Sequence, residues 1–139
     1  MLRQSSSLFS IRVSHPGLHE VTDDVAEFVN ETGIRDGLLT LFCRHTSASL
    51  LIQEKGALSA RRDLERYFAR IAPEGGEYEH DDEGSDDMPA HLRSALTATQ
   101  PSIPVKDGKP VLGTWQGIFL FEHRANMPER QVALHLIGE

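Results

Sequence analysis

The stretch HTSASLLIQE, residues 45–54, places a histidine, three hydroxyl side chains, an amide and a carboxylate around the apolar Leu50, Leu51 and Ile52. It follows the apolar run 38–43, which we predict to be a strand that continues into His45. A plain core strand has no need of so many polar groups. The pattern predicts the edge of a site, formed by a further strand or by a tight excursion of the chain.

Helices and strands are predicted on both sides of this stretch. Residues 8–13 alternate as a half-buried strand does, and further strands are expected at 103–105, 111–112, 117–122 and 130–137. Thr22 is placed to cap a first helix that Gly33 ends, residues 57–72 form the clearest helix, and a third begins near Asp86 or Asp87 with Pro89 in its first turn. We expect one compact α+β domain over residues 1–139, with about three helices and a substantial mixed or antiparallel sheet, whose last two strands can form a hairpin.

Composition limits the partners that we expect. The chain of 139 residues is long enough for one domain, and its net charge is −7. Affinity for phosphate backbones comes mainly from clustered Lys and Arg, so this charge argues against a nucleic-acid partner. The basic residues between Arg61 and Arg70 do cluster, but they alternate with acidic residues and fit the solvated face of a helix.

Three further features concern location. No apolar run approaches the roughly 20 residues needed to cross a bilayer. The first residues, MLRQSSSLFSIRV, show no apolar core followed by a small-residue cleavage site, as a signal peptide would. The single Cys43 cannot form an internal disulfide, which fits a reducing compartment. We therefore expect a cytoplasmic protein without a membrane partner.

Three histidines from separate segments predict a metal site or a proton carrier. His45 ends a strand, His80 lies in an acidic loop, and His91 lies in the first turn of the third helix. Neutral imidazole is a common metal ligand and also titrates near neutral pH. If the three meet, a divalent metal is the expected cofactor, with zinc favoured by ligand type and manganese or magnesium admitted by added carboxylates.

Three other side chains each allow two interpretations. Glu54 is either a general base or metal partner, or a surface carboxylate beside Lys55, because its odd spacing from His45 points it to the opposite face of an ideal strand. Asp87 either caps the third helix or joins the metal ligands. Cys43 either forms a thiolate pair with His45 or is buried packing, and we favour packing.

The final third of the chain adds candidates for ligand binding. Trp115 and Gln116 lie between two glycines, where the tryptophan either stacks on a planar ring or packs in the core, and the glutamine is placed to recognise a polar edge. Glu122 and Arg130 either pair with each other across the last loop or leave Arg130 to hold a phosphate or carboxylate.

The ordered motifs HTSASLLIQE, YEH, DDMPAHLRSAL, IPVKDG and LGTWQGIFLFEH, with a closing strand at Arg130, resemble the secondary thiamine-phosphate synthase family over nearly the whole chain. The resemblance implies a compact α+β fold that assembles as a homotrimer. It also implies a pocket that holds His45, His80 and His91, with Glu54 and Asp87 as acidic partners. The chain departs from the family pattern at Asp87-Met88 and at His123-Arg124, which bears on metal preference and substrate charge.

The reaction that this resemblance implies joins phosphorylated pyrimidine and thiazole precursors of thiamine and releases pyrophosphate. This reaction is either the main activity of the site or a side activity. A divalent metal would neutralise the leaving pyrophosphate. Two rival functions use the same groups: a metal-dependent hydrolase of phosphorylated small molecules, and a non-enzymatic trimeric protein that binds metal or anions. The expected site comprises His45, Glu54 and His91 as catalytic residues, Thr46, Ser47, Trp115, Gln116 and Arg130 as substrate-binding residues, and His45, His80, His91 and Asp87 as metal ligands.

Overall fold

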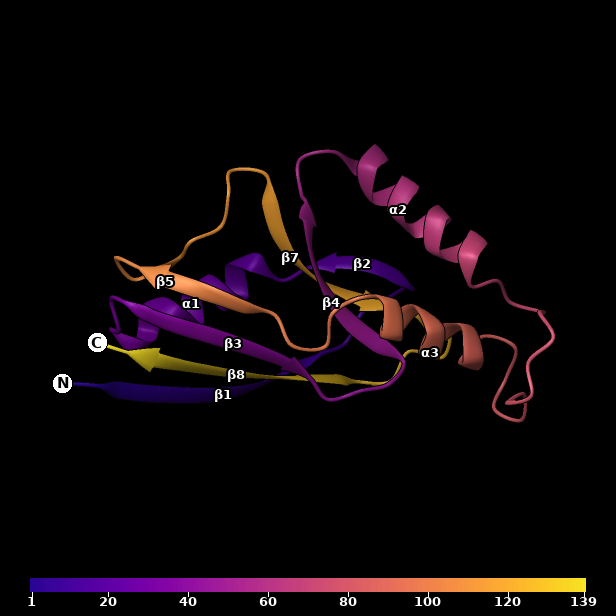
Figure 1. The fold of residues 1–139 in the computed structure, drawn as a ribbon, viewed down its shortest axis with the longest axis horizontal. Helices are drawn as coiled ribbons and strands as arrows, with labels where there is room; N and C mark the ends of the chain where they lie inside the picture. The colour runs from indigo at the N-terminus through magenta and orange to yellow at the C-terminus, as the bar shows by residue number, and fades with distance from the viewer.

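Two antiparallel sheets form the frame of the computed structural model, which describes residues 1–139 (Figure 1). The five-stranded sheet has the order β1-β8-β3-β5-β6, with bounds Arg3–Ile11, Arg130–Gly138, Gly37–Cys43, Ser102–Lys106 and Lys109–Pro110. The three-stranded sheet has the order β2-β7-β4, with bounds Gly17–Glu20, Gln116–Glu122 and Ala48–Glu54. The helices are α1 (Thr22–Thr32), α2 (Leu58–Ile71) and α3 (Asp87–Leu96). The predicted α+β domain with three helices is confirmed.

Strand β8 lies between β1 and β3 in the larger sheet. It pairs with β1 along its whole length, from Arg3 opposite Gly138 to Ile11 opposite Arg130, and with β3 on its other side. At the crowded end, a Cβ added to Gly138 would lie 2.0 Å from the carbonyl oxygen of Asp36, so only glycine fits there.

The predicted hairpin between the last two strands is wrong. Strand β7 lies between β2 and β4 in the smaller sheet, whereas β8 lies in the larger one. Residues Gly117 to Glu122 are all buried, so both edges and both faces of β7 are already covered. The segment 123–129 therefore carries the chain from one sheet to the other. The sequence interpretation also missed β2 by ending the first strand region at residues 15–17.

The main core lies between the two sheets and α1. Alternate residues of β3 and β8, such as Leu39, Leu41 and Leu134, pack against Val25 and Val29 of α1. Gly33 ends α1, as predicted, and it adopts the left-handed conformation. The expected cap is wrong, because the helix already includes Thr22.

The hydroxyl of Thr22 makes tertiary hydrogen bonds instead of capping the helix. It donates to Glu20 Oε2 at 2.8 Å and accepts from the Ile118 backbone N–H at 2.9 Å. This contact ties the start of α1 to the middle of β7. No side-chain hydrogen bond caps the helix.

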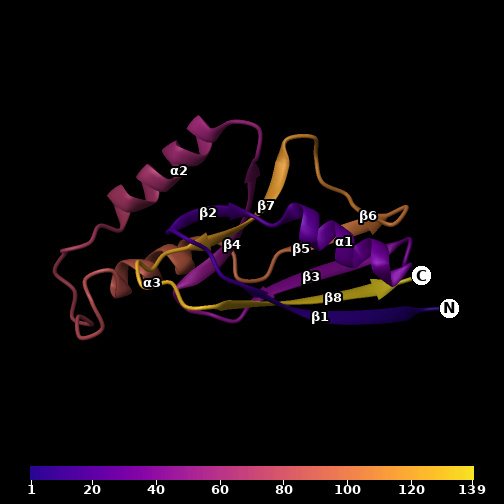
Figure 2. The same cartoon turned by 180° about the vertical axis from the view of Figure 1, so that it is seen from behind.

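The other two helices lie toward one end of the molecule, away from α1 (Figure 2). Helix α2 has no fully buried residue and packs Leu64 and Phe68 on a small cluster that includes Phe119 and Phe121. Helix α3 lies beside the start of β4, where Asp87 and Ala90 are buried. None of the helices combines the length and the apolar character that crossing a bilayer requires.

Candidate metal centre

Two histidines and one aspartate meet at the start of α3. His80 Nε2 lies 3.0 Å from Asp87 Oδ2, and His91 Nε2 lies 3.2 Å from the same oxygen. Asp87 and His91 are four residues apart on one helix, so they share a face, and His80 reaches them from the acidic loop (residues 77–86). The three ligand atoms all lie within 4.8 Å of one another.

The orientation of His91 is fixed by the chain that precedes β4. His91 Nδ1 lies 2.8 Å from the carbonyl oxygen of Thr46. A carbonyl oxygen only accepts, so Nδ1 carries a proton, and Nε2 is the ring nitrogen that points at Asp87. Histidines that bind metals usually donate their other ring N–H to such an oxygen, because this fixes both the tautomer and the ring plane.

Asp87 is a carboxylate enclosed by partners. Its Oδ1 accepts a hydrogen bond from Arg124 Nη1, and its side chain is almost completely buried. Burial pushes the pKa of Asp87 upward, but His91, Arg124 and the hydrogen bond from His80 outweigh burial and lower the pKa below its ordinary value. The group is therefore an ionised oxygen donor at neutral pH. Its predicted role as a helix cap is wrong, since no side-chain bond caps α3.

The donor set fits a divalent transition metal. Two imidazole nitrogens and one carboxylate oxygen are ligands that zinc accepts, whereas magnesium prefers oxygen ligands alone. Three protein ligands also leave room for another ligand, as in zinc sites that act on small molecules. The side chains brought together by α3 therefore have both the chemistry and the spacing of a metal centre.

His45 lies outside this group of three, although the sequence placed it among the metal ligands. Its Nε2 accepts a hydrogen bond from the backbone N–H of Gln131 at 2.8 Å, which commits that lone pair to β8. Burial, followed by the charge of Arg130, lowers the pKa of His45, so the ring is neutral and carries its proton on Nδ1. His45 is thus a hydrogen-bond donor beside the metal centre.

Cys43 is buried packing, as favoured from the sequence. Its Sγ lies 3.4 Å from the carbonyl oxygen of Ala48, and burial raises the pKa of the thiol. It forms no thiolate pair with His45.

An open pocket of about 1000 Å³ adjoins the metal centre. His91 belongs to both, because its ring lines the pocket while its Nε2 faces Asp87. The remaining polar lining comes mainly from the connection between β3 and β4 and from α3: Arg44, His45, Thr46, Ser47, Ser94 and Thr99. Of the predicted substrate-binding residues, Thr46 and Ser47 thus line this pocket.

Arg130 lies behind the pocket wall. Its Nε donates to Glu122 Oε1 at 2.8 Å, and its two terminal nitrogens donate to the hydroxyl and carbonyl oxygens of Ser47, both at 3.1 Å. Arg130 and Glu122 are almost fully buried, and they pair although β7 and β8 form no hairpin. Arg130 therefore positions the Ser47 segment from inside the protein.

Glu54, Trp115 and Gln116 are not near the histidines. Glu54 lies opposite Gln116 at one end of the β4–β7 pair, and the other end, where Ala48 lies opposite Glu122, adjoins the pocket. The carboxylate of Glu54 accepts from the backbone N–H of Ala57 at 2.9 Å, and Trp115 is 66% exposed. The structure therefore separates these three predicted site residues from the metal centre.

Two participating residues were missed by sequence reasoning. Arg124 holds Asp87 and also donates to the carbonyl oxygen of Glu83 at 2.9 Å, which ties the acidic loop to α3. His123 is buried next to it, with Nε2 2.9 Å from Ser49 Oγ and with Nδ1 unpaired. The only signal for either was the departure of His123-Arg124 from the family pattern, since their partners lie far away in the sequence.

Comparison with known proteins identifies the relatives of this chain. The model of a family described as UPF0047 protein YjbQ-like matches residues 8–139. A UPF0047 protein of Synechocystis is 46% identical over 138 residues, covering 99% of this chain and 94% of its own. The UPF0047 protein YjbQ of Escherichia coli O157:H7 is 44% identical over 124 residues, covering 88% of this chain and 90% of its own.

Solved structures agree with the fold. A YbjQ-like protein of unknown function from Sulfolobus solfataricus superposes with a TM-score of 0.93 over 100% of both chains, at 24% identity. A hypothetical protein of Aeropyrum pernix superposes with a TM-score of 0.88 over 97% of this chain and 99% of its own, at 28% identity. The expected thiamine-phosphate synthase family and its reaction are wrong, because the matching model and relatives are described as UPF0047 proteins and none is described by thiamine synthesis.

Proposed function

Since this chain belongs to the UPF0047 YjbQ-like family, we propose its function from the side chains that the family fold brings together: it binds a divalent transition-metal ion through His80, Asp87 and His91. Zinc suits this donor set best, and manganese is the second choice. A bound ion of this kind supplies a Lewis acid that can hold and polarise an oxygen of a small molecule.

The observation that carries the proposal is the hydrogen bond from His91 Nδ1 to Thr46. It leaves Nε2 as the only ring atom free to bind, and that atom faces an ionised carboxylate and a second imidazole. Once the protons between them are removed, the carboxylate oxygen and the two imidazole nitrogens are all electron-pair donors that point at one another, so a cation can take the place of those protons. A divalent cation satisfies all three groups at once.

The metal proposal is tested by titrating protein stripped with a chelator. We expect about one zinc ion per chain by calorimetry, with manganese weaker and magnesium weakest. His91→Ala should weaken zinc binding by about 100-fold, because it removes a ligand, and Asp87→Asn should also weaken it. His135→Ala is the matched control, since His135 is a partly exposed histidine of β8 whose hydrogen-bond partner is Gln4. Zinc affinity that is equal in the His91 and His135 variants, with circular dichroism unchanged, would contradict the proposal.

We further propose that the pocket beside the metal receives a small anionic molecule of the phosphorylated class. Arg44 lines it with a guanidinium that Gln131 Oε1 holds at 2.7 Å, and His45 contributes a ring N–H. These donors, with the hydroxyl groups of the lining, match the acceptor oxygens of phosphate.

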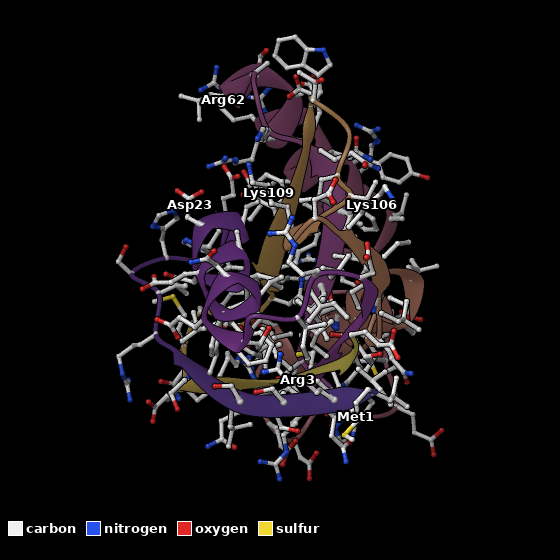
Figure 3. The ribbon with its side chains drawn as sticks, turned by 90° about the vertical axis from the view of Figure 1, so that its left-hand side faces the viewer. Met1, Arg3, Asp23, Arg62, Lys106 and Lys109 are labelled. Atoms are coloured by element: carbon white, nitrogen blue, oxygen red, sulfur yellow. The ribbon has the colours of Figure 1, made fainter.

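Inorganic phosphate tests the pocket on zinc-loaded protein. Arg44→Gln should weaken phosphate binding by about tenfold, which is the effect of losing one charged hydrogen bond. Arg62→Gln is the control, because Arg62 lies on α2 (labelled in Figure 3) and no residue of α2 lines the pocket. Equal loss in both variants would mean that phosphate responds only to net charge and not to the pocket.

Assembly as a homotrimer also remains our proposal, and it is supported by the outer face of the larger sheet. Leu8, Leu38, Phe42 and Ile137 lie on this face with 37% to 48% of their surface exposed. Apolar side chains gathered on an uncovered sheet face are typical of contacts between subunits.

A further inference from the structure

We propose that the free edge of β1 beside α1 binds an extended basic peptide segment, which adds a strand to the five-stranded sheet. A groove of about 410 Å³ runs between the two elements. It is lined by residues 7–11 of β1 and by four residues of α1, three of which are acidic. This groove is separate from the metal centre, so the proposal does not depend on the function proposed above.

Main-chain groups of β1 are available on the side that faces the groove. Strand β1 is the outermost strand of its sheet and pairs only with β8. No other backbone hydrogen bond involves β1. In an antiparallel pair, every second residue of an edge strand points its N–H and C=O away from the partner. Five consecutive residues line the groove, as expected for a strand edge, whereas a strand face would contribute alternate residues.

The edge lacks the features by which proteins usually prevent pairing. Its sequence is RQSSSLFSI, so nine residues are extended and none after Arg3 is charged or a proline. Exposed edges are normally shortened or interrupted by lysine, proline or a bulge. An edge of this length and composition is suited to receive another strand.

Charge identifies the occupant. Asp24, Glu27 and Glu31 are spaced three and four residues apart and so face the groove together. Helix α1 carries no Lys or Arg that would neutralise them. A second copy of the chain paired through the same edge would bring two acidic helices close together, in a protein whose net charge is already −7. A segment rich in Lys or Arg is attracted instead.

The pleat of the sheet sets the pattern of the segment. Helix α1 packs on the inner face, where Phe9 meets Phe28 edge-to-face with ring centroids 6.3 Å apart. In Figure 3, α1 lies above β1 on this side. Side chains of an added strand that point inward would meet the acidic residues of α1, and those that point outward would lie beside the exposed Leu8. The structure therefore assigns the groove a segment in which basic and apolar residues alternate.

A synthetic peptide of about ten residues with alternating lysine and valine tests this assignment. We expect saturable binding to the labelled protein by nuclear magnetic resonance and slower amide exchange confined to β1. A peptide with glutamate in place of lysine should not bind. The lysine peptide methylated on alternate backbone nitrogens should bind at least about tenfold more weakly, because it keeps the charge but loses the strand hydrogen bonds. Equal binding of the methylated peptide would overturn the proposal.

Matched variants separate the groove from net charge. The triple variant Asp24→Asn, Glu27→Gln, Glu31→Gln should weaken binding by at least about tenfold. The control Glu77→Gln, Glu79→Gln, Glu129→Gln removes the same charge from exposed positions outside the groove and should change binding by less than about twofold. Equal losses in the two variants would overturn the proposal. So would β1 amides that are already protected in the free protein at all outward positions, because a second copy would then occupy the edge.

Discussion

At the scale of single residues, His123 shows how burial keeps a titratable side chain uncharged. Ser49 contacts its Nε2, Thr97 Oγ1 lies 2.5 Å from Ser49 Oγ, and only 3% of His123 is exposed. Burial, followed by the charges of Arg93 and Arg130, lowers the pKa of His123 to about 3. The ring is therefore neutral throughout the physiological range and serves as part of the wall between α3 and β7.

This shift predicts a dependence of stability on pH. Above pH 6.5 the ring is neutral in both the folded and the unfolded chain. As pH falls from 6.5 toward about 3, only the unfolded chain takes up the proton, so the free energy of unfolding falls by up to about 1.4 kcal/mol per pH unit. Urea unfolding between pH 7 and pH 4 should show a shallower decline for His123→Gln than for the wild type. Parallel declines would show that His123 is protonated in the folded protein.

Residue chemistry could be predicted for part of the site. His80, Asp87 and His91 were all named as metal ligands from the sequence, and the structure brings their side chains together. The sequence could not predict how each histidine ring is oriented. The hydrogen-bond partner of His91 is a backbone carbonyl, and that of His45 is a backbone N–H. Because nearly every residue has such main-chain groups, these partners cannot be recognised from residue types. The separation of Glu54 and Trp115 from the histidines likewise follows from strand register alone.

At the scale of elements, the three helices differ in how firmly they are held. Helix α1 buries Val25, Phe28 and Val29, whereas α2 has no fully buried residue. Amides in elements with little buried apolar surface exchange through local opening that costs less free energy. We predict that the amides of α2 exchange with deuterium about tenfold or more faster than those of α1, measured on the intact protein. Equal protection of the two helices would mean that α2 is covered by a partner.

Elements with a strong local pattern were predicted well, and pairings were not. The helix expected at 57–72 is α2 at Leu58–Ile71, because its apolar stripe and the Pro-Gly segment after it are local signals. The predicted hairpin of 117–122 with 130–137 is wrong. It was favoured by nearness in sequence, but the two strands lie in different sheets. Strands β7 and β8 each pair with two strands from earlier in the chain, and no local sequence pattern reveals these partners.

At the scale of the whole molecule, the outer face of the larger sheet predicts self-association. Phe42 is 43% exposed on a face where Leu38 and Ile137 are also exposed. We expect light scattering to give the mass of three chains, and Phe42→Glu to shift the protein toward a single chain, because burying an unpaired charge in the contact costs several kcal/mol. Ser59→Glu, at an exposed position of α2 away from this sheet, is the control because it adds the same single negative charge. A single-chain mass for the wild type would contradict trimer assembly.

The place of β8 between β1 and β3 has a consequence for the order of synthesis. A ribosome releases β1 and β3 long before β8, so the two strands wait without the strand that joins them. Their pairing surfaces stay open during that time, and the many contacts between distant segments make closure slow. The sheet can therefore close only after translation has passed residue 138, and a nascent chain arrested before that point should be recognised by chaperones as unfinished.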